Sequence, residues 1–304
     1  MPGTPDTLRL PAATMLFLAG KGGVGKTTAA VSIALQLARK HPDRRYTLIS
    51  VDPAHAVRDV FAEEKPPQNL TVETINTRAK WQTLRATLGD EIERAVAALT
   101  PGNLTLAYDA EAMKKLLEIA PPGADELFAV TRLADLSQDQ AQARVIVDTA
   151  PTGHFLRLLE LPHTAGEWVR EFMRILLRYR ELIPAGALGQ ELVNASRSLT
   201  ALEQTLHSDR AAVIVVTRPE RIVIAETKRL IDELERRKIK VAAVIANYVT
   251  PENECPCDQS VRAEESGRLA RSLRASRPET LIPRQETPVV GLDDLARLFT
   301  VAEV

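Results

Sequence analysis

The chain has 304 residues, of which 45% are hydrophobic and 26% are charged, and its 39 Lys and Arg nearly balance its 40 Asp and Glu. This composition excludes a disordered or collagen-like protein. Because the charges balance, the chain has no excess of basic residues that would indicate nucleic-acid binding. The longest apolar runs, such as 15–19, are far shorter than the roughly 20 residues of a membrane-spanning helix. We expect no membrane span and no secretory signal, and the two cysteines, too few for a disulfide framework, favour the cytoplasm.

Short apolar runs predict strands in chain order at residues 15–19, 46–51, 145–147, 211–216 and 241–245. Their apolarity is continuous rather than alternating, which is typical of strands covered on both faces in a parallel sheet. The run at 70–75 predicts a further strand at an edge. Helical patterns at 27–39 and 225–238 lie between the strands. The expected fold class is therefore α/β, with a doubly wound and mostly parallel sheet.

Two long intervals, 78–142 and 155–207, contain no strand pattern and indicate helices. We expect a helical subdomain inserted into the connections of a single domain over residues 1–304, and ordinary crossover helices on the sheet are the alternative. Apolar residues from Trp168 to Ile183 recur at helical spacing and predict a helix with a broad apolar face. A mixture of Arg and Glu at 262–277 indicates a further, solvated helix.

The segment after the first predicted strand matches the pattern GxxxxGK[ST] and opens a helix, which is the context that this pattern requires. Its residues are Gly20, Lys21, Gly22, Gly23, Val24, Gly25, Lys26, Thr27 and Thr28. Glycines let successive backbone amides face phosphate oxygens, and the N-terminus of the next helix adds its positive end. We expect Lys26 on the terminal phosphates and the Thr27 hydroxyl on Mg²⁺. The segment therefore predicts a nucleotide site.

Two carboxylates follow other predicted strands. Asp52 comes directly after 46–51, and Asp148 directly after 145–147. The carboxyl ends of parallel strands form the edge where α/β sheets bind ligands. Acids there can hold Mg²⁺ or its waters, or orient the water that attacks a phosphate. Asn247 follows another strand in a segment that lacks the NKxD pattern of guanine sites, which favours ATP over GTP.

Lys21 gives the phosphate loop the form KGGVGKT. This form resembles the deviant Walker A branch of the P-loop NTPases, which contains ParA, MinD, the nitrogenase iron protein and the arsenical-pump ATPases. In that branch the lysine reaches the nucleotide of the partner subunit. The resemblance therefore implies a homodimer that closes on ATP, and a solvated lysine is the alternative for this residue.

The segments DPAH at 52–55 and DTAPTGHFLRLL at 148–159 resemble the family of the ArsA arsenical pump-driving ATPases and the Get-pathway ATPase that targets tail-anchored membrane proteins. Further segments resemble the same family, and they lie at 121–126, 220–227, 281–283 and 289–291. Together the similar segments extend over roughly residues 14–300.

This resemblance implies roles for individual residues. Asp52 would polarise the hydrolytic water, with Lys21 as the second catalytic residue, and Asp148 would hold Mg²⁺ through a water. The residues implied in nucleoside binding are Glu220, which would also act across the dimer, Asn247 and Pro283. An ion-paired or strand-end structural role is the alternative for each carboxylate.

Cys255 and Cys257 lie where the targeting members of this family carry a CxxC pair that binds Zn²⁺ across the dimer. Here the spacing is CPC, and one pair from each chain would supply four thiolates in tetrahedral geometry. Free or redox-active thiols and incidental cysteines are the alternatives. A metalloid site of three separated thiolates, as in the pump-driving members, is excluded because the chain has no third cysteine.

The resemblance implies an ATP-hydrolysing dimeric switch, similar to the ATPases that target tail-anchored proteins, which couples closure to a hydrophobic or protein client. The apolar face from Trp168 to Ile183 is then either the client surface or packed core. The alternative is the catalytic subunit of an anion or metalloid (arsenite) efflux pump, acting with a membrane partner protein. This chain lacks the basic patch of a ParA-like or MinD-like partitioning ATPase. It also lacks the separated cysteines that would hold the cluster of an iron–sulfur reductase. Both alternatives are therefore disfavoured.

Overall fold

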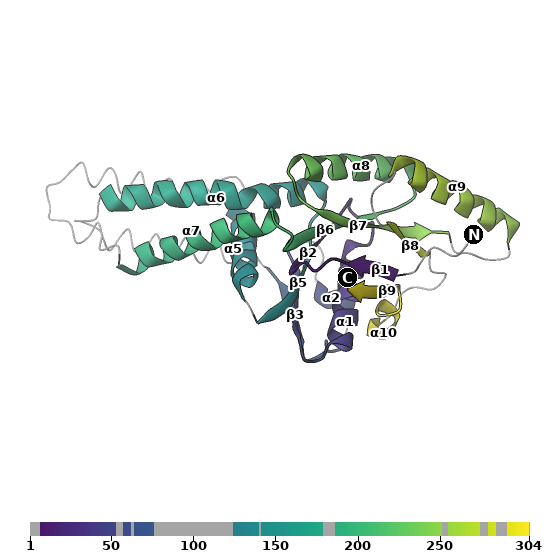
Figure 1. Cartoon of the computed structure of the whole chain (residues 1–304), viewed down its shortest axis with the longest axis horizontal. Helices are drawn as coiled ribbons and strands as arrows, with labels where there is room; N and C mark the ends of the chain where they lie inside the picture. Colours follow the sequence, from purple (N-terminus) through teal and green to yellow (C-terminus); the bar gives the residue numbers. More distant parts are fainter. Residues whose placement is uncertain are drawn as a thin grey trace. The chain divides into compact units, whose positions relative to one another are not determined.

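The six predicted strands all pair in one seven-stranded sheet of the computed structural model (Figure 1). Every pair of neighbouring strands in this sheet is parallel, which confirms the expected α/β class. The predicted edge strand at 70–75 lies at an edge of the sheet. In spatial order the strands are β4 (Leu70–Thr74), β3 (Arg45–Ser50), β5 (Gln142–Asp148), β2 (Met15–Ala19), β6 (Ala211–Thr217), β7 (Val241–Val249) and β8 (Glu279–Pro283).

The structure describes residues 7–52, 57–61, 64–75, 124–139, 141–178, 186–250, 255–273, 279–283 and 291–303. The chain divides into two compact units. The first comprises Met1–Ile75, Asp139–Leu156 and Gln204–Val304, and the second comprises Asn76–Gln138 and Arg157–Glu203. The expected limits of an inserted helical subdomain, 78–142 and 155–207, stay a prediction, because residues 76–123 lie outside the described residues.

The helices at 27–39 and 225–238 are confirmed, although the second begins four residues earlier than its apolar pattern. The helix expected at 262–277 is present with its bounds shifted toward the N-terminus. The helices of the described residues are α1 (Lys26–Lys40), α2 (Val57–Phe61), α5 (Ala124–Gln138), α6 (Thr152–Arg178), α7 (Gly186–Leu206), α8 (Arg221–Arg236), α9 (Pro256–Ser272) and α10 (Gly291–Leu295). None of them is long and apolar enough to cross a membrane.

The strand order reverses at β2. Strands β5, β3 and β4 lie on one side of it, and β6, β7 and β8 lie on the other. Such a reversal is a topological switch point, and ligands of open α/β sheets bind outside the carboxyl ends of the strands at this point. Because β2 ends at Ala19, the glycine-rich segment that follows lies at this switch point.

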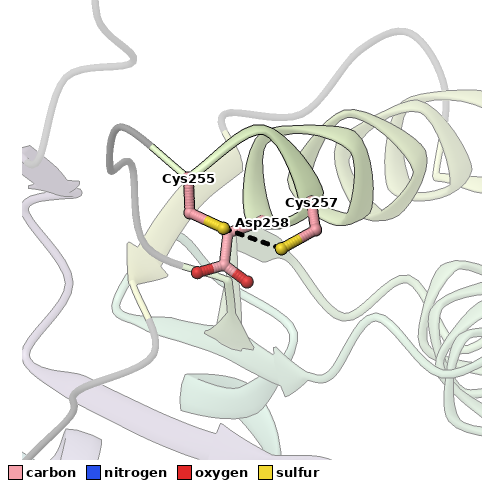
Figure 2. Close-up of side chains that lie close together, drawn as sticks. All are labelled: Cys255, Cys257 and Asp258. Atoms are coloured by element: carbon pink, nitrogen blue, oxygen red, sulfur yellow. Dashed lines mark hydrogen bonds between the residues drawn. The ribbon is translucent and has the colours of Figure 1, made fainter.

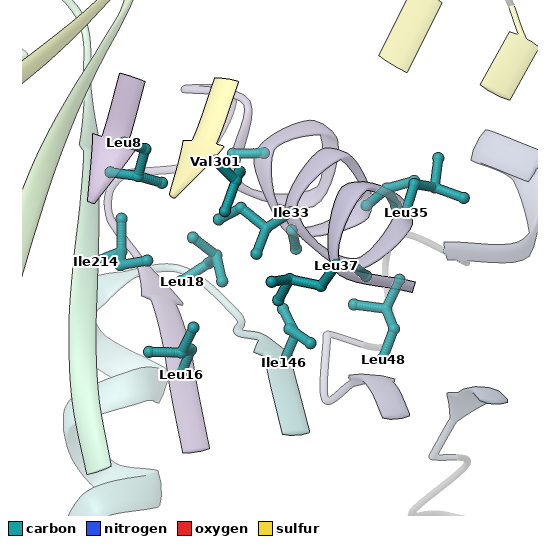
Figure 3. Close-up of a cluster of buried hydrophobic side chains, with 14 of the residues drawn as sticks. Leu8, Leu16, Leu18, Ile33, Leu35, Leu37, Leu48, Ile146, Ile214 and Val301 are labelled. Carbon is teal, nitrogen blue, oxygen red and sulfur yellow. The ribbon is translucent and has the colours of Figure 1, made fainter. Parts of the chain in front are cut away.

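The core of the first unit holds this segment in place. Ile33 and Leu37 of α1 pack beside Leu18 of β2 and Ile146 of β5, all at most 1% exposed (Figure 3). Burial of each such side chain contributes about 1.5–3 kcal/mol. All five residues of β2 are buried, as expected for a strand covered on both faces. The N-terminus of α1 is therefore fixed against the end of β2.

A second, two-stranded sheet was not expected from the sequence. It pairs β1 (Thr7–Leu10) in parallel with β9 (Thr300–Glu303). Glu303 Oε1 lies 3.3 Å from Nη2 of the buried Arg144, and His41 Nε2 lies 3.0 Å from Glu303 Oε2. Arg144 Nη2 also donates to the Pro11 carbonyl at 2.9 Å. These contacts join β9 to the main sheet at β5.

The second unit consists of helices in its described part. Gln138 Nε2 of α5 donates to Ser198 Oγ of α7 at 3.0 Å. His163 Nδ1 of α6 lies 3.4 Å from Glu203 Oε1 of α7. The helix predicted around Trp168 is present in α6 up to Arg178. The side chains that make its predicted apolar face lie outside the described residues, so its role as client surface or packed core stays a prediction.

Candidate nucleotide-binding site

The glycine-rich segment has the backbone shape of a phosphate cradle. Gly20 has φ +151°, and a Cβ at this position would collide with the carbonyl oxygen of Val216 on β6. Gly25 has φ +95° and precedes α1 without a side-chain cap. The first turn of α1 contains no acidic residue. Its amide groups and positive dipole end are therefore available to an anion.

Lys26 is a buried cation at the start of α1. Its side chain is 6% exposed, and Nζ donates to the Lys21 carbonyl at 3.2 Å. Burial lowers the pKa of Lys26, while the charges of Asp148 and Asp52 oppose this effect. Within the described part of the chain, no carboxylate lies within ion-pair distance of Nζ. A phosphate group would supply the negative charge that this buried cation lacks.

Thr27 and Asp148 meet at the same edge of the sheet. Thr27 Oγ1 donates to Asp148 Oδ2 at 2.8 Å, and Ser50 Oγ donates to the same oxygen at 3.3 Å. Asp148 is fully buried, and its Oδ1 has no hydrogen-bond partner among the described residues. Burial raises the pKa of Asp148 to about 6, although Thr27, Lys26 and Ser50 stabilise the carboxylate.

Thr27 and the buried Asp148 carboxylate offer oxygen atoms to a cation. A buried carboxylate oxygen without a donor is unfavourable unless a cation or a bound water satisfies it. A hydroxyl beside a carboxylate is an oxygen donor set of the kind that Mg²⁺ prefers, in part through retained waters. Thr27 and Asp148 therefore fit a magnesium ion.

Asp52 lies beside this pair. It is 6% exposed, and its charge acts on Lys26. Ser50 is the register partner of Asp148 in the β3–β5 pairing, and the Val51 amide donates to the Asp148 carbonyl at 3.0 Å. The two predicted carboxylates therefore end adjacent strands next to the phosphate cradle. His55 of the DPAH segment lies outside the described residues.

Lys21 is engaged within its own chain. Its Nζ lies 3.4 Å from Glu226 Oε2 on α8, and both side chains are about one-third exposed, at 37% and 30%. This pairing could not be predicted from the sequence, because Lys21 and Glu226 are far apart in the chain and neither belongs to a local charge pattern. The lysine is therefore neither freely solvated nor in contact with the cradle through its Nζ.

Asn247 reaches the phosphate cradle from the end of β7. Its Nδ2 donates to the Val24 carbonyl at 3.0 Å, and its Oδ1 accepts from the Tyr248 amide at 2.9 Å. A Cβ on Gly25 would collide with this same amide group. The residue predicted to contact the nucleoside thus also supports the loop.

The other two residues predicted to contact the nucleoside lie on neighbouring elements. Glu220 precedes α8, and its Oε1 lies 2.8 Å from Nη2 of Arg218. The Arg218 guanidinium also lies 4.4 Å from the centre of the Tyr248 ring, a cation–π contact. Pro283 ends β8 and is the register partner of Val249. The sequence reading missed Arg218 and Tyr248, which carry no motif and meet only through the β6–β7 pairing.

The two cysteines form a cluster at the start of α9. Figure 2 shows Cys255, Cys257 and Asp258 side by side, with the two sulfur atoms 2.7 Å apart. Hydrogen bonds from Cys257 and from backbone amides lower the pKa of Cys255, while the same contact raises that of Cys257. Two sulfurs and a carboxylate oxygen lie within 4.8 Å of one another. Because zinc takes sulfur ligands, the two adjacent thiols fit Zn²⁺ as half of a tetrahedral set.

Comparison with known proteins gives consistent matches over nearly the whole chain. Residues 13–300 match the model of a family described as anion-transporting ATPase. The chain is 34% identical over 250 residues to the ATPase GET3 of Kluyveromyces lactis, covering 77% of this chain and 71% of that protein. It is 29% identical over 280 residues to an ATPase ASNA1 homolog of Entamoeba dispar, covering 84% of this chain and 83% of that protein. It is also 29% identical over 299 residues to the putative arsenical pump-driving ATPase 2 of Aquifex aeolicus, covering 92% of this chain and 96% of that protein.

Proposed function

The chain belongs to the family of anion-transporting ATPases, and from this membership we propose that it is a homodimeric switch that closes on ATP and couples closure to a hydrophobic client. That the chain is an ATPase follows from the family and from its relatives. One observation supports ATP hydrolysis at this site. Thr27 and Asp148 meet beside the buried Lys26, so a hydroxyl, a carboxylate and a cation converge where phosphoryl transfer needs them.

The chain's own residues would bind and orient the substrate. The amides of the glycine-rich segment face the phosphates of ATP, and Lys26 neutralises charge on the terminal one. Thr27 would hold Mg²⁺ directly and Asp148 would hold it through a water, and the ion would neutralise charge on the phosphates when bound. Asp52 accepts a hydrogen bond from the attacking water and so orients it toward the terminal phosphorus. Asn247 borders the nucleoside, together with Glu220 and Pro283.

Closure of the dimer would use Lys21. In the single chain its Nζ lies beside Glu226, at a distance typical of a weak, partly exposed ion pair. We propose that ATP draws Lys21 away from Glu226 and onto the nucleotide of the partner subunit. Because an exposed pair stabilises by at most about 1 kcal/mol, the exchange is easily driven by contact with a phosphate.

The client would bind to the second unit in a nucleotide-dependent manner. The amphipathic pattern from Trp168 to Ile183 supports an apolar surface for a transmembrane segment, in the manner of the targeting ATPases that this sequence resembles. Closure changes client affinity only if the client binds the two states differently. We propose the cytoplasm as the compartment, since ATP and newly made membrane proteins are both present there.

Zinc would stabilise the dimer at α9. One Cys255–Cys257 pair from each chain would complete a tetrahedral set of four thiolates. Metal analysis of the purified protein tests this, with about one zinc per two chains expected. Loss of zinc in Cys257→Ser but not in Asp258→Asn would support thiolate ligation. A metal-free wild-type protein that dimerises normally would remove zinc from the proposal.

The second candidate function is the catalytic subunit of an anion efflux pump. The family description and the similarity to the arsenical pump-driving ATPase of Aquifex aeolicus favour it. The cysteine count opposes a thiolate site for arsenite of the kind made by three separated cysteines. Hydrolysis that rises with arsenite or another oxyanion would favour the pump.

A capture experiment tests the client. Asp52→Asn, loaded with Mg²⁺ and ATP, would be co-expressed with a tagged tail-anchored segment of about 20 apolar residues. We expect ATP-dependent capture near one segment per dimer. A matched segment with two central lysines should not be captured. Failure to capture the apolar segment, with dimer closure intact, would overturn the client and leave the ATPase switch.

A further inference from the structure

The arrangement of the site indicates the direction in which a bound nucleotide extends. The phosphate cradle follows β2, whereas Asp52 follows β3 and Asp148 ends β5, on one side of that strand. In the proposed function, Mg²⁺, the attacking water and the terminal phosphate belong to that side. The sugar and base therefore extend to the other side, across the carboxyl ends of β6 and β7.

An aromatic side chain stands exposed at the end of β7. Tyr248 is 43% exposed, and among the large hydrophobic side chains that the described residues expose it is the aromatic one. It directly follows Asn247, whose Nδ2 donates to the Val24 carbonyl of the cradle at 3.0 Å. Tyr248 thus adjoins a residue that touches the cradle, and packing in the core does not account for its ring.

The backbone at Tyr248 is held in an unfavourable conformation. Its φ of +59° lies in the left-handed region, which is costly for a bulky side chain. The pairing of β7 with β8 shifts its register between Ala246 and Val249, so the regular alternation of side chains is interrupted here. The Tyr248 amide donates to Asn247 Oδ1 at 2.9 Å, which helps to hold this conformation. Strained residues of this kind cluster at ligand sites.

A cation covers part of the Tyr248 ring. Arg218 directly follows β6, and its guanidinium carbon lies 4.4 Å from the centre of the ring. Arg218 Nη2 lies 2.8 Å from Glu220 Oε1. These contacts fix the ring across the ends of β6 and β7, where the base is expected. A guanidinium takes one face of an aromatic ring and leaves the other face to a planar group.

We propose that Tyr248 stacks on the base of the bound nucleotide, with the Arg218 guanidinium on the opposite face of its ring. This inference rests on the proposed nucleotide site and adds to it a residue that carries no motif. Stacking on an aromatic face is tolerant of the base, because every base has such a face. Tyr248 therefore supplies affinity for the nucleoside, and the ring loses little freedom on binding because Arg218 already holds it.

The test compares a nucleotide with its phosphates alone. Titration calorimetry of the full chain with Mg²⁺ measures binding of ADP and of inorganic pyrophosphate, which has no base. Tyr248→Leu should weaken ADP about tenfold, as expected for the loss of one stacked base, and leave pyrophosphate within about twofold. Tyr248→Asn should behave in the same way, and because asparagine tolerates the left-handed conformation, this variant protects the test against misfolding.

Two variants that retain an aromatic ring are the matched controls. Tyr248→Phe and Tyr248→Trp should keep the affinity for ADP within about twofold of the wild type. The added fluorescence of Tyr248→Trp should be quenched by ADP but not by pyrophosphate.

Three outcomes would overturn the stacking role. They are unchanged ADP affinity in Tyr248→Leu and Tyr248→Asn, equal weakening of ADP and pyrophosphate, and fluorescence that responds to pyrophosphate as it does to ADP. The second outcome would mean that Tyr248 acts on the cradle through Asn247. A wild-type chain that binds neither ligand would overturn the nucleotide site itself, and this inference with it.

Discussion

Lys21 and Glu226, separated by most of the chain, are joined by a 3.4 Å contact between Nζ and Oε2. The residue that marks this branch of ATPases is thereby held by α8 of its own chain. This contact gives the single chain a defined resting position for Lys21. Any contact of Lys21 with a partner subunit has to replace it.

Glu226→Gln should promote ATP-driven dimerisation, because Lys21 no longer needs to leave an ion pair. Each of the two chains gives up one exposed pair worth at most about 1 kcal/mol, so the dimer Kd with ATP should fall by up to about thirtyfold. Analytical ultracentrifugation of the wild type and the variant measures this. Asp232→Asn on the same helix is the control and should leave Kd unchanged. A weaker dimer in Glu226→Gln would mean that this carboxylate supports closure rather than restrains it.

Gly25→Ala should destabilise the phosphate cradle. Its φ of +95° is unfavourable for alanine by about 1–2 kcal/mol, and the new Cβ would displace the Asn247 amide from the Val24 carbonyl. We expect a loss of at least about 2 kcal/mol in the free energy of unfolding and no measurable ATP binding. Gly153→Ala is the control for stability, because nothing lies within 4 Å of its Cβ position. It should be neutral or slightly stabilising. Normal nucleotide affinity in Gly25→Ala would contradict the geometry of the cradle.

Asp148→Asn should stabilise the nucleotide-free protein at neutral pH. The pKa of Asp148 is raised from 3.8 to about 6, so between these values the folded state binds more protons than the unfolded state. Its stability therefore falls as pH rises through this window and levels off above it. The variant keeps an acceptor for Thr27 and removes the buried charge, and it should gain at most about 3 kcal/mol at pH 7.

Urea unfolding at pH 7 and at pH 4 measures this difference. The gain at pH 7 should be largely absent at pH 4, and Mg²⁺-dependent hydrolysis should be lost because the ion has lost its acidic partner. Equal or lower stability of Asp148→Asn at pH 7 would show that the folded protein already compensates the carboxylate.

Glu303→Gln should destabilise the chain through Arg144. Arg144 is only 5% exposed, and removal of its carboxylate partner leaves a buried charge uncompensated. Breaking a buried pair costs about 3–5 kcal/mol, and the partial exposure of Glu303, at 25%, places the expected loss near the lower end. Asp293→Asn removes an exposed surface pair with Arg39 and should change stability by less than about 1 kcal/mol. Chemical unfolding of the two variants distinguishes them, and equal effects would refute the role of Arg144.

The sequence predicted the elements whose residues carry a local signal. Continuous apolar runs located β2, β3, β5, β6 and β7, because strands buried on both faces must be apolar throughout. The phosphate loop was predictable because its glycines, lysine and threonine are adjacent in the chain. The short strands β1, β8 and β9 were not predicted. Segments such as TLRL at 7–10 are only four residues long, too short for their alternation to stand out in the sequence, and they form strands by pairing with a distant segment.

Side-chain pairings were less predictable than elements. The expectation that Asp52 and Asp148 lie at the ligand-binding edge of the sheet followed from the rule for parallel strand ends, and the structure brings Asp148 to Thr27 as well. The contacts of Lys21 with Glu226 and of Asn247 with Val24 depend on how α8 and β7 are placed, which no local pattern encodes. Sequence alone therefore indicates which residues belong to the site, but not what holds them in the single chain.

The central claim is that ATP closes a homodimer through Lys21, and light scattering tests it most directly. The chain would carry Asp52→Asn to prevent hydrolysis, together with Cys255→Ser and Cys257→Ser to remove any zinc-bridged dimer. We predict a mass near that of one chain, 33.4 kDa, without nucleotide, and twice that mass with Mg²⁺ and ATP. Adding Lys21→Ala should abolish the doubling. A mass that does not respond to ATP, or that doubles equally without Lys21, would contradict the account.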